Sequence, residues 1–284
     1  MALVPVIDLL QRADREGYAV GAFNANNMEI IQAIIAAAEK EHAPVIMQAS
    51  QGAIKYAGLE FITGMVKIAA EASKVPVALH LDHGTDFDQV IKCIRSGFSS
   101  VMYDGSKLPL EENIAITKKV LEITRAIGVS VEAELGKIGG TEDEVFVSER
   151  EAMYTDPEQA RYFVEQTGIQ SLAIAIGTAH GQYKGDPQLD FARLQKIKSL
   201  IKIPIVLHGS SGVSDESVRK AISLGVCKVN IDTNIREAFV WEMRRRLEAD
   251  QDEIDPRNIL GPARDAAIAI IREKIRVFGS SGKA

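Results

Sequence analysis

The sequence predicts an α/β protein, a (β/α)8 TIM barrel with an extra C-terminal helix, on three observations. Short apolar runs alternate with longer amphipathic stretches along most of the 284 residues. Glycine ends predicted helices at Gly97, Gly128 and Gly168, while Pro44 and Pro76 open predicted strands. Each apolar run also leads into a polar residue, which is typical of barrels whose strands deliver functional groups to one face.

Eight runs are predicted to be strands. In chain order they span residues 19–23, 44–48, 76–81, 100–103, 129–134, 171–176, 203–207 and 227–231. The helices predicted between them span residues 29–41, 61–72, 88–96, 111–126, 157–166, 191–200 and 215–224. Alternating strands and helices require parallel pairing with right-handed crossovers. Eight such units favour a closed barrel, and an open doubly wound sheet is the alternative.

The C-terminal tail predicts two more helices, over residues 233–248 and 262–277, joined by Asp255-Pro256-Arg257. The first belongs to the eighth unit. The second is extra, and it is expected to cover the barrel floor or to meet another subunit. Because no linker or shift in composition divides the chain, residues 1–284 are expected to form a single domain.

Composition excludes several classes of protein. The chain is 46% apolar and 25% charged, as is ordinary for a soluble protein. Its net charge is −6 with acidic residues spread throughout, which argues against nucleic-acid or anionic-membrane partners. No apolar stretch approaches the ~20 residues that cross a bilayer, and the first residues do not resemble a secretory signal. Cys93 and Cys227 are expected to be small buried residues, so a cytoplasmic enzyme fits.

Three of the five histidines follow apolar runs: His83, His180 and His208. Neutral imidazole is a good ligand for a divalent ion, and catalytic zinc usually keeps three protein ligands and one open position. These residues would come from units three, six and seven of a barrel, whose strand ends converge. The sequence therefore predicts a metal site. Three separate hydrogen-bonded histidines are the alternative.

Alternation within strands predicts which side chains face the barrel interior. Glu132 and Glu134 share one face of their strand, and Lys228 and Asn230 share one face of theirs. A buried lysine needs a partner. We therefore expect Lys228 to pair with an inward carboxylate such as Glu132.

Two segments are suited to binding anions, at residues 208–212 and 230–234. Their small residues and a following helix N-terminus would present N–H groups to a phosphate, at loops where barrel enzymes often hold one. Residues 136–156 are long for a barrel loop and carry acidic side chains, which indicates a lid or, alternatively, a solvated turn. Residues 181–187 are a second candidate for a mobile loop.

Five segments together resemble one family, the metal-dependent (class II) ketose-bisphosphate aldolases that act on fructose or tagatose bisphosphate. The resemblance covers essentially the whole chain. Its most specific segments are His80-Leu81-Asp82-His83-Gly84, Ser130-Val131-Glu132-Ala133-Glu134-Leu135-Gly136, Gly177-Thr178-Ala179-His180-Gly181, Leu207-His208-Gly209-Ser210-Ser211-Gly212 and Lys228-Val229-Asn230-Ile231-Asp232-Thr233.

The resemblance implies cofactors and the residues that hold them. Zn²⁺ would be bound by His83, His180 and His208, with Asp104 and Glu134 near a second divalent position. A monovalent cation, Na⁺ or K⁺, would lie close to the glycines of the phosphate site.

It also implies catalytic and substrate-binding residues. Asp82 would act as acid and base on the aldehyde oxygen, Glu142 in the lid would exchange the C3 proton, and Asn230 would steady the enediolate. The segment Thr141-Glu142-Asp143-Glu144 departs from relatives that often have two glutamates before the aspartate. The residues implied to contact substrate are Asn24, Ser50, Gly181, Gly209, Ser210, Ser211, Asn230, Ile231, Asp232 and Thr233, with Arg257 reaching the distal phosphate.

The implied reaction is the reversible cleavage of fructose 1,6-bisphosphate to dihydroxyacetone phosphate and glyceraldehyde 3-phosphate through a zinc-stabilised enediolate, a step of glycolysis. The same cleavage of tagatose 1,6-bisphosphate is the alternative. The family also implies a homodimer or homotetramer. The residues leave three alternative functions open: a Schiff-base aldolase using Lys228, a hydrolase of the amidohydrolase type and a sugar-phosphate binding module.

Overall fold

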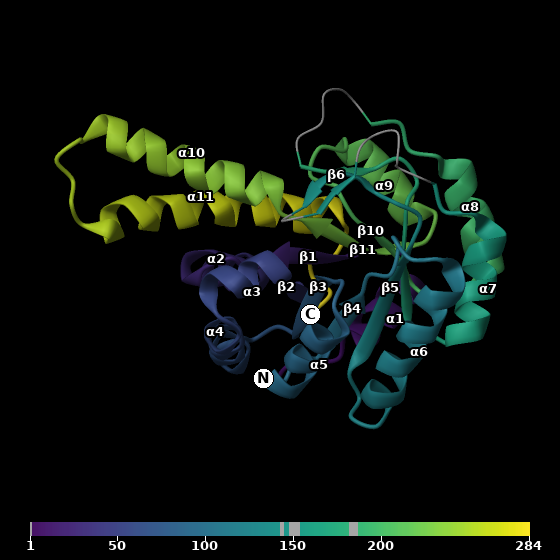
Figure 1. Ribbon diagram of the computed structural model, residues 1–284. Coiled ribbons are helices and arrows are strands. Elements are labelled where there is room, and N and C mark those ends of the chain that lie inside the picture. Colours follow the sequence, from purple (N-terminus) through teal and green to yellow (C-terminus); the bar gives the residue numbers. More distant parts are fainter. Residues whose placement is uncertain (1, 143–144, 148–153, 182–186) are drawn as a thin grey trace.

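The computed structural model describes residues 2–142, 145–147, 154–181 and 187–284. Eight parallel strands close into a barrel in the order β1-β11-β10-β8-β5-β4-β3-β2, drawn in Figure 1. They are β1 Val20–Asn24, β2 Val45–Ser50, β3 Val77–Gly84, β4 Ser100–Tyr103, β5 Ser130–Leu135, β8 Ser171–Ile174, β10 Ile205–Leu207 and β11 Val226–Ile231. Each strand lies within three residues of its predicted ends. The closed barrel is confirmed, and the open sheet is excluded.

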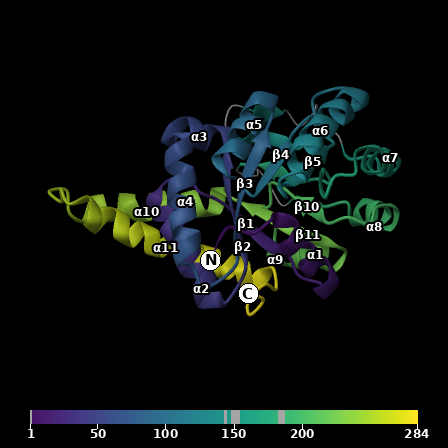
Figure 2. The same cartoon turned by 90° about the horizontal axis from the view of Figure 1, so that it is seen from below.

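Helices surround the barrel, as Figures 1 and 2 show from two sides. The helices predicted between strands are α2 Met28–Glu41, α4 Leu59–Ala72, α5 Phe87–Ser96, α6 Leu110–Arg125, α7 Pro157–Thr167, α8 Phe191–Leu200 and α9 Asp215–Ser223. Short polar side chains begin several of them: the Asn27 side chain accepts the Ile30 N–H, for example, and Asp156 caps α7 with Pro157 at its first position. Among the described residues, no helix is both long and apolar enough to cross a membrane.

Helix α1 (Val6–Glu16) covers the floor of the barrel. Its apolar residues Val6, Leu9, Leu10 and Ala13 follow helical spacing and are buried. They join one hydrophobic cluster with inward side chains of the strands, namely Val20, Ala22, Ile46, Ala78 and Cys227. Of the two alternatives expected for the second C-terminal helix, covering the floor is therefore excluded, because an N-terminal helix already occupies that end. Contact with another subunit stays a prediction.

The C-terminal helices form a hairpin that projects from the barrel (Figure 1). Helix α10 spans Thr233–Ala249 and α11 spans Pro256–Val277. Helix α11 begins six residues before the predicted start, because Asp255 caps it and Pro256 suits the first turn of a helix, while Pro262 lies inside it. It packs along α10 and returns to contact α2.

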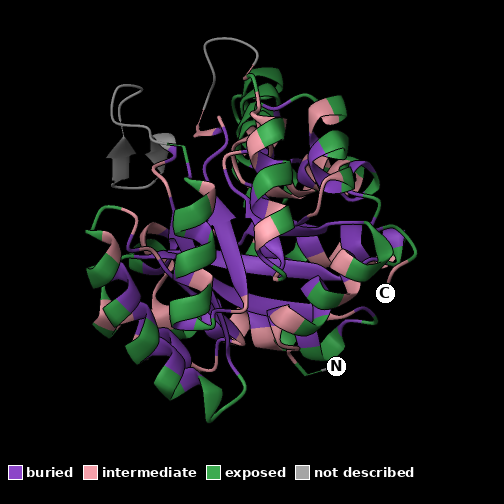
Figure 3. Ribbon diagram, turned by 90° about the vertical axis from the view of Figure 1, so that its right-hand side faces the viewer, coloured by how far each residue is buried: buried purple, intermediate pink, exposed green. Residues whose placement is uncertain are grey.

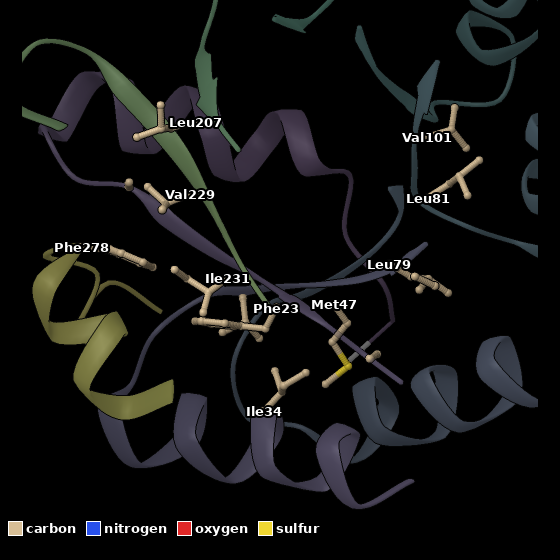
Figure 4. Close-up of a cluster of buried hydrophobic side chains, with 14 of the residues drawn as sticks. Phe23, Ile34, Met47, Leu79, Leu81, Val101, Leu207, Val229, Ile231 and Phe278 are labelled. Carbon is tan, nitrogen blue, oxygen red and sulfur yellow. The ribbon is translucent and has the colours of Figure 1, made fainter. Parts of the chain in front are cut away.

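The apolar core lies between the barrel wall and the helices. Phe23, Met47, Leu79 and Ile231 are at most 1% exposed and pack outward against helical residues such as Ile34, as Figure 4 shows. Figure 3 shows that the strands are buried and that the surrounding helices carry the exposed residues. Full burial of such side chains contributes about 1.5–3 kcal/mol each.

The polar side chains on the same strands have the opposite orientation. Because successive residues of a strand alternate between its faces, the neighbours of these outward residues point into the barrel. Gln48, His80 and Asp82 are fully buried there. The barrel interior is thus polar toward the carboxyl ends of its strands.

Candidate metal centre and active site

The three histidines predicted as ligands come together at one mouth of the barrel. His83 lies at the end of β3, His180 on the short strand β9 (Ala179–His180), and His208 directly after β10. One nitrogen from each ring can be chosen so that all three lie within 4.8 Å of one another. The ring centroids are 4.7–6.1 Å apart, with nearly perpendicular planes. Three imidazoles so placed fit a divalent ion.

Backbone irregularity brings His83 into this cluster. In a regular strand, His83 would face the side opposite to its neighbour Asp82. Instead, the pairing of β3 with β4 shifts register between Leu81 and Gly84, and His83 adopts a left-handed φ of 47°. Such a break redirects a side chain. It allows two consecutive residues to serve the same site.

His180 depends on a small sheet that sequence analysis did not predict. Strand β9 pairs with β6 (Gly139–Glu142), which in turn pairs with β7 (Val145–Val147). Within this sheet Gly140 stands opposite His180. The main chain of the predicted lid is therefore attached beside the histidine cluster. Residues 143–144, 148–153 and 182–186 of the two predicted mobile loops lie outside the described residues, as does the side chain of Glu142.

Two carboxylates flank the histidines where a second divalent position was predicted. The Nδ1 atom of His83 is hydrogen-bonded to Asp104 Oδ2 at 2.9 Å. Glu134 Oε2 lies 4.0 Å from His83 Nδ1 and 3.9 Å from His208 Nδ1. His83, Asp104 and Glu134 form a second group able to hold a metal. Burial alone would raise the pKa of Asp104, but its contact with His83 holds it well below its usual range.

His208 is fully buried and has a partner on each ring nitrogen. Its Nδ1 atom lies 2.8 Å from His83 Nε2, and its Nε2 atom lies 2.9 Å from Glu132 Oε1. Burial lowers the pKa of His208 to about 4, despite the opposing hydrogen bond with Glu132. The ring is thus neutral at pH 7, the form that binds a metal.

The predicted pairing of Lys228 with Glu132 is confirmed. Lys228 Nζ lies 2.8 Å from Glu132 Oε2, and the two side chains are 0% and 1% exposed. His80 Nε2 lies 3.2 Å from the same ammonium. Burial by itself would raise the pKa of Glu132, but Lys228 and the bond to His208 hold it well below its usual range. The carboxylate is therefore ionised directly beneath the histidines.

Asp82 is held by two amides. Asn230 Nδ2 donates to Asp82 Oδ1 at 3.1 Å, and Gln48 Nε2 donates to Asp82 Oδ2 at 2.9 Å and to Asn24 Oδ1 at 2.6 Å. Sequence analysis missed Gln48, although its position two residues before Ser50 within an apolar run indicates an inward polar side chain. Gln48 Oε1 and Asn230 Oδ1 are buried without a hydrogen-bond partner among the described residues. Such atoms are expected where a ligand completes the network.

An open pocket of about 350 Å³, its mouth included, adjoins the histidines. Seven predicted substrate contacts line it: Asn24, Gly181, Gly209, Ser211, Asn230, Asp232 and Thr233. Gly209 has a φ of +62°, and a Cβ there would come within 2.5 Å of the Ala179 carbonyl oxygen, so only glycine allows this close approach. Helix α10 begins at Thr233 and points its N-terminus toward the pocket, which suits a phosphate.

Arg236 is a further lining residue that sequence analysis missed. It lies one helical turn after Asp232, and the two side chains are 2.7 Å apart. A basic residue in the first turn of the helix that follows the anion segment is the signal that could have indicated it. A guanidinium at this rim adds positive charge to a site suited to anions.

The other four predicted contacts do not line this pocket. The Ser50 hydroxyl accepts the Ala53 N–H as the cap of α3 (Gln51–Ala57), and Ser210 is buried against the main chain of its own loop. The side chain of Ile231 packs in the core. Arg257 is the second residue of α11, whose first turn lies at the far end of the hairpin in Figure 1. Its side chain is 88% exposed and paired with Asp255 at 2.7 Å. Within one chain, Arg257 is therefore not brought to the pocket.

A parallel barrel with three imidazoles and a glycine-lined pocket at the carboxyl ends of its strands has the architecture of a barrel enzyme with a candidate metal site. The family model described as class-II fructose-bisphosphate aldolase matches residues 4–283. The chain therefore belongs to the class-II fructose-bisphosphate aldolase family, and it is an aldolase, a carbon–carbon lyase.

Individual relatives resemble the chain over its full length. A fructose-bisphosphate aldolase from Geobacillus stearothermophilus is 49% identical, covering 100% of this chain and 99% of its own. The fructose-bisphosphate aldolase of Thermus caldophilus is 46% identical over 99% of this chain and all of its own. The crystal structure of the YdjI aldolase from Escherichia coli K12 superposes with a TM-score of 0.88 at 35% identity, covering 99% of both chains.

Proposed function

We propose that this aldolase reversibly cleaves fructose 1,6-bisphosphate to dihydroxyacetone phosphate and glyceraldehyde 3-phosphate, as a cytoplasmic step of glycolysis. The observation that carries the proposal is the convergence of His83, His180 and His208 beside a pocket whose lining residue Asn230 is hydrogen-bonded to Asp82. Relatives at 46–49% identity bear the name of this substrate. The whole of residues 1–284 would act as one domain.

In this proposal, the three histidines hold Zn²⁺. The donor set fits, because neutral imidazoles suit zinc and leave an open position for substrate oxygens. The ion would act as a Lewis acid on the ketone oxygen, acidifying the neighbouring carbon. Asp104 and Glu134 would serve a second divalent position, and Na⁺ or K⁺ would lie beside Gly181 and Gly209.

The acid–base steps fall to three residues. Glu142, from the lid, takes the C3 proton of dihydroxyacetone phosphate. Asn230 donates its amide N–H to the negative charge that then develops on the substrate oxygens. Asp82 protonates the new alkoxide during condensation and removes the same proton during cleavage. The amides of Gln48 and Asn230 orient the Asp82 carboxylate for that transfer.

The phosphate of dihydroxyacetone phosphate would occupy the glycine-lined pocket. Gly181 and Gly209 offer main-chain N–H groups without a side chain in the way, and Ser211 and Thr233 add hydroxyls. Ser210 and the main chain of residues 230–233 complete the cradle. Asn24 and Ser50 are proposed to contact the sugar chain. Arg257 is proposed to reach the distal phosphate, which it could do only from another subunit of the proposed oligomer.

The proposed assembly is a homodimer or homotetramer. Large apolar side chains are exposed on the projecting hairpin, including Val240 at 41% and Trp241 at 63%. Apolar surface of this kind is often covered by a partner. Size-exclusion chromatography with light scattering measures the molecular mass, which decides between a dimer and a tetramer.

Cleavage rates on fructose and tagatose 1,6-bisphosphate, measured side by side, test the substrate. We expect kcat/KM to be higher with the fructose sugar, and the reverse order would assign the tagatose reaction. A chelator should remove the activity and added zinc should restore it. Borohydride with substrate should trap no adduct on Lys228, whereas a trapped adduct would establish Schiff-base chemistry instead.

A further inference from the structure

We infer that Glu132 is a positioning residue, which presents His208 to the metal through Nδ1, and that Lys228 holds Glu132 in place for this task. The inference rests on the proposed metal site and extends it beneath its ligands. Neither residue belongs to the cluster of possible ligand atoms. Both act on the site through the imidazole of His208.

The contacts form a continuous buried chain below the histidines. Lys228 Nζ bonds Glu132 Oε2 at 2.8 Å, and the second oxygen, Oε1, lies 2.9 Å from His208 Nε2. On its other side the ammonium lies 3.2 Å from His80 Nε2, and His80 Nδ1 lies 2.8 Å from Ser100 Oγ. All five side chains are at most 1% exposed. Water therefore does not compete for these bonds.

The chemistry of the groups fixes the direction of each bond. An ammonium only donates, and an ionised carboxylate only accepts. Since Glu132 accepts, the proton of His208 must be on Nε2. The unprotonated Nδ1 then faces His83 Nε2, 2.8 Å away, where the ligand nitrogens converge.

The same logic applies to His80. Facing a donor-only ammonium, its Nε2 accepts, so its Nδ1–H donates to Ser100. Lys228 thus fixes one histidine directly and the other through Glu132. A carboxylate behind a ligand histidine orients the ring and increases its basicity, and its loss typically weakens metal binding by about 10–100-fold.

The zinc affinities of two double variants test the inference. Each variant removes the buried negative charge of Glu132 and the buried positive charge of Lys228 together. Glu132→Leu with Lys228→Met removes the acceptor and leaves no buried charge unpaired. Competition against a chromophoric chelator should show zinc bound about 10–100-fold more weakly than by the wild type. Glu132→Gln with Lys228→Met keeps an amide oxygen that can accept from Nε2–H, and its affinity should lie between those of the other two proteins.

The matched control is Ser100→Ala, which breaks a buried bond in the same chain of contacts without touching His208. It should lower the stability of the metal-free protein in urea and leave the zinc affinity within about twofold of wild type. Wild-type affinity in the Leu/Met protein would overturn the inference. If the wild type itself binds no divalent ion in the histidine cluster, the proposed function fails instead.

The protonation site of His208 in the wild-type protein gives a second test that needs no substitution of Glu132 or Lys228. Nitrogen-15 chemical shifts of the metal-free protein, assigned by the signal that disappears in His208→Asn, report which ring nitrogen carries hydrogen. We expect a protonated Nε2 and an unprotonated Nδ1. A proton on Nδ1 would refute the role given to Glu132.

Discussion

Asp82 is a buried carboxylate oriented by amides. Gln48 donates one hydrogen bond to it from the neighbouring strand β2, and Asn230 donates another from β11 across the barrel interior. Amide donors fix the direction in which a carboxylate presents its oxygens. A group held in this way can both give and take a proton.

The substitution Asp82→Ala should separate the two proton transfers of the proposed reaction. Cleavage of the sugar bisphosphate should fall by about 10²–10⁴-fold, as is usual when a general acid–base residue is lost. Exchange of the C3 proton of dihydroxyacetone phosphate with deuterated water should continue, because that step belongs to Glu142. Proton NMR follows the exchange, and the zinc content must match wild type. Loss of both activities together would argue against this division of roles.

Several site residues could be predicted from sequence because each depends on local order. His83, His180 and His208 follow strands, and the alternation of faces predicted the pairing of Lys228 with Glu132, which the structure confirms. The left-handed backbone of His83 was not predictable, because nothing in its neighbours specifies a register shift. Glu142 and the other untested roles remain predictions.

At the scale of elements, strand periodicity and punctuation by glycine and proline were enough to place the barrel. Helix α1 was missed, although its apolar residues have helical spacing, because a helix before the first strand is not part of the repeating unit. The sheet of β6, β7 and β9 was missed because its glycines and short strands carry no apolar alternation. The position of Arg257 depends on where the α10–α11 hairpin points, which the sequence pattern does not encode.

A buried carboxylate on α2 forms ion pairs with two arginines of helix α11. Glu41 is 8% exposed at its side chain and contacts Arg276 at 2.7 Å and Arg272 at 2.8 Å, with a further bond from Ser281. Its hydrogen bond with Arg276, above all, lowers the pKa of Glu41 to about 2. A carboxyl whose pKa falls on folding stabilises the native state above its unfolded pKa.

Glu41→Gln should therefore lower the free energy of unfolding in a pH-dependent way. At pH 7 we expect a loss of about 1–2 kcal/mol, moderated by the exposure of Arg276. The loss should shrink as the pH falls from about 4.5 to about 2, since wild-type Glu41 then becomes protonated too. Urea unfolding at pH 7, 4 and 3 measures it. Exposed Glu273 on the same helix offers the control Glu273→Gln, and a difference independent of pH would contradict the assignment.

For the molecule as a whole, the proposed metal joins segments far apart in sequence. Its ligands come from β3, β9 and the end of β10, and the unfolded chain cannot assemble them. Any ligand that binds only the folded state stabilises it in proportion to the logarithm of its concentration over Kd. Metal binding and global stability are therefore coupled.

Added zinc should raise the melting temperature of metal-free protein. At 100 times Kd the gain is about 2.7 kcal/mol, which corresponds to several degrees in a chain of this size. Differential scanning calorimetry with and without chelator measures the shift. His180→Asn, which removes the least buried of the three ligands, should show a much smaller one. An equal shift in that variant would place the stabilising zinc elsewhere.

Only two non-glycine residues in the described part of the chain adopt a left-handed φ, His42 at 48° and His83 at 47°. This conformation costs an ordinary residue about 1–2 kcal/mol. His42 ends α2 with its side chain exposed. His42→Gly should therefore raise the free energy of unfolding in urea by about 0.5–1 kcal/mol. A lower free energy of unfolding would contradict a cost of the left-handed φ at this position. At His83 the same exchange would delete a proposed metal ligand. Evolution can therefore replace His42 by a residue that adopts this φ at lower cost. The proposed role of His83 rules out the same replacement there.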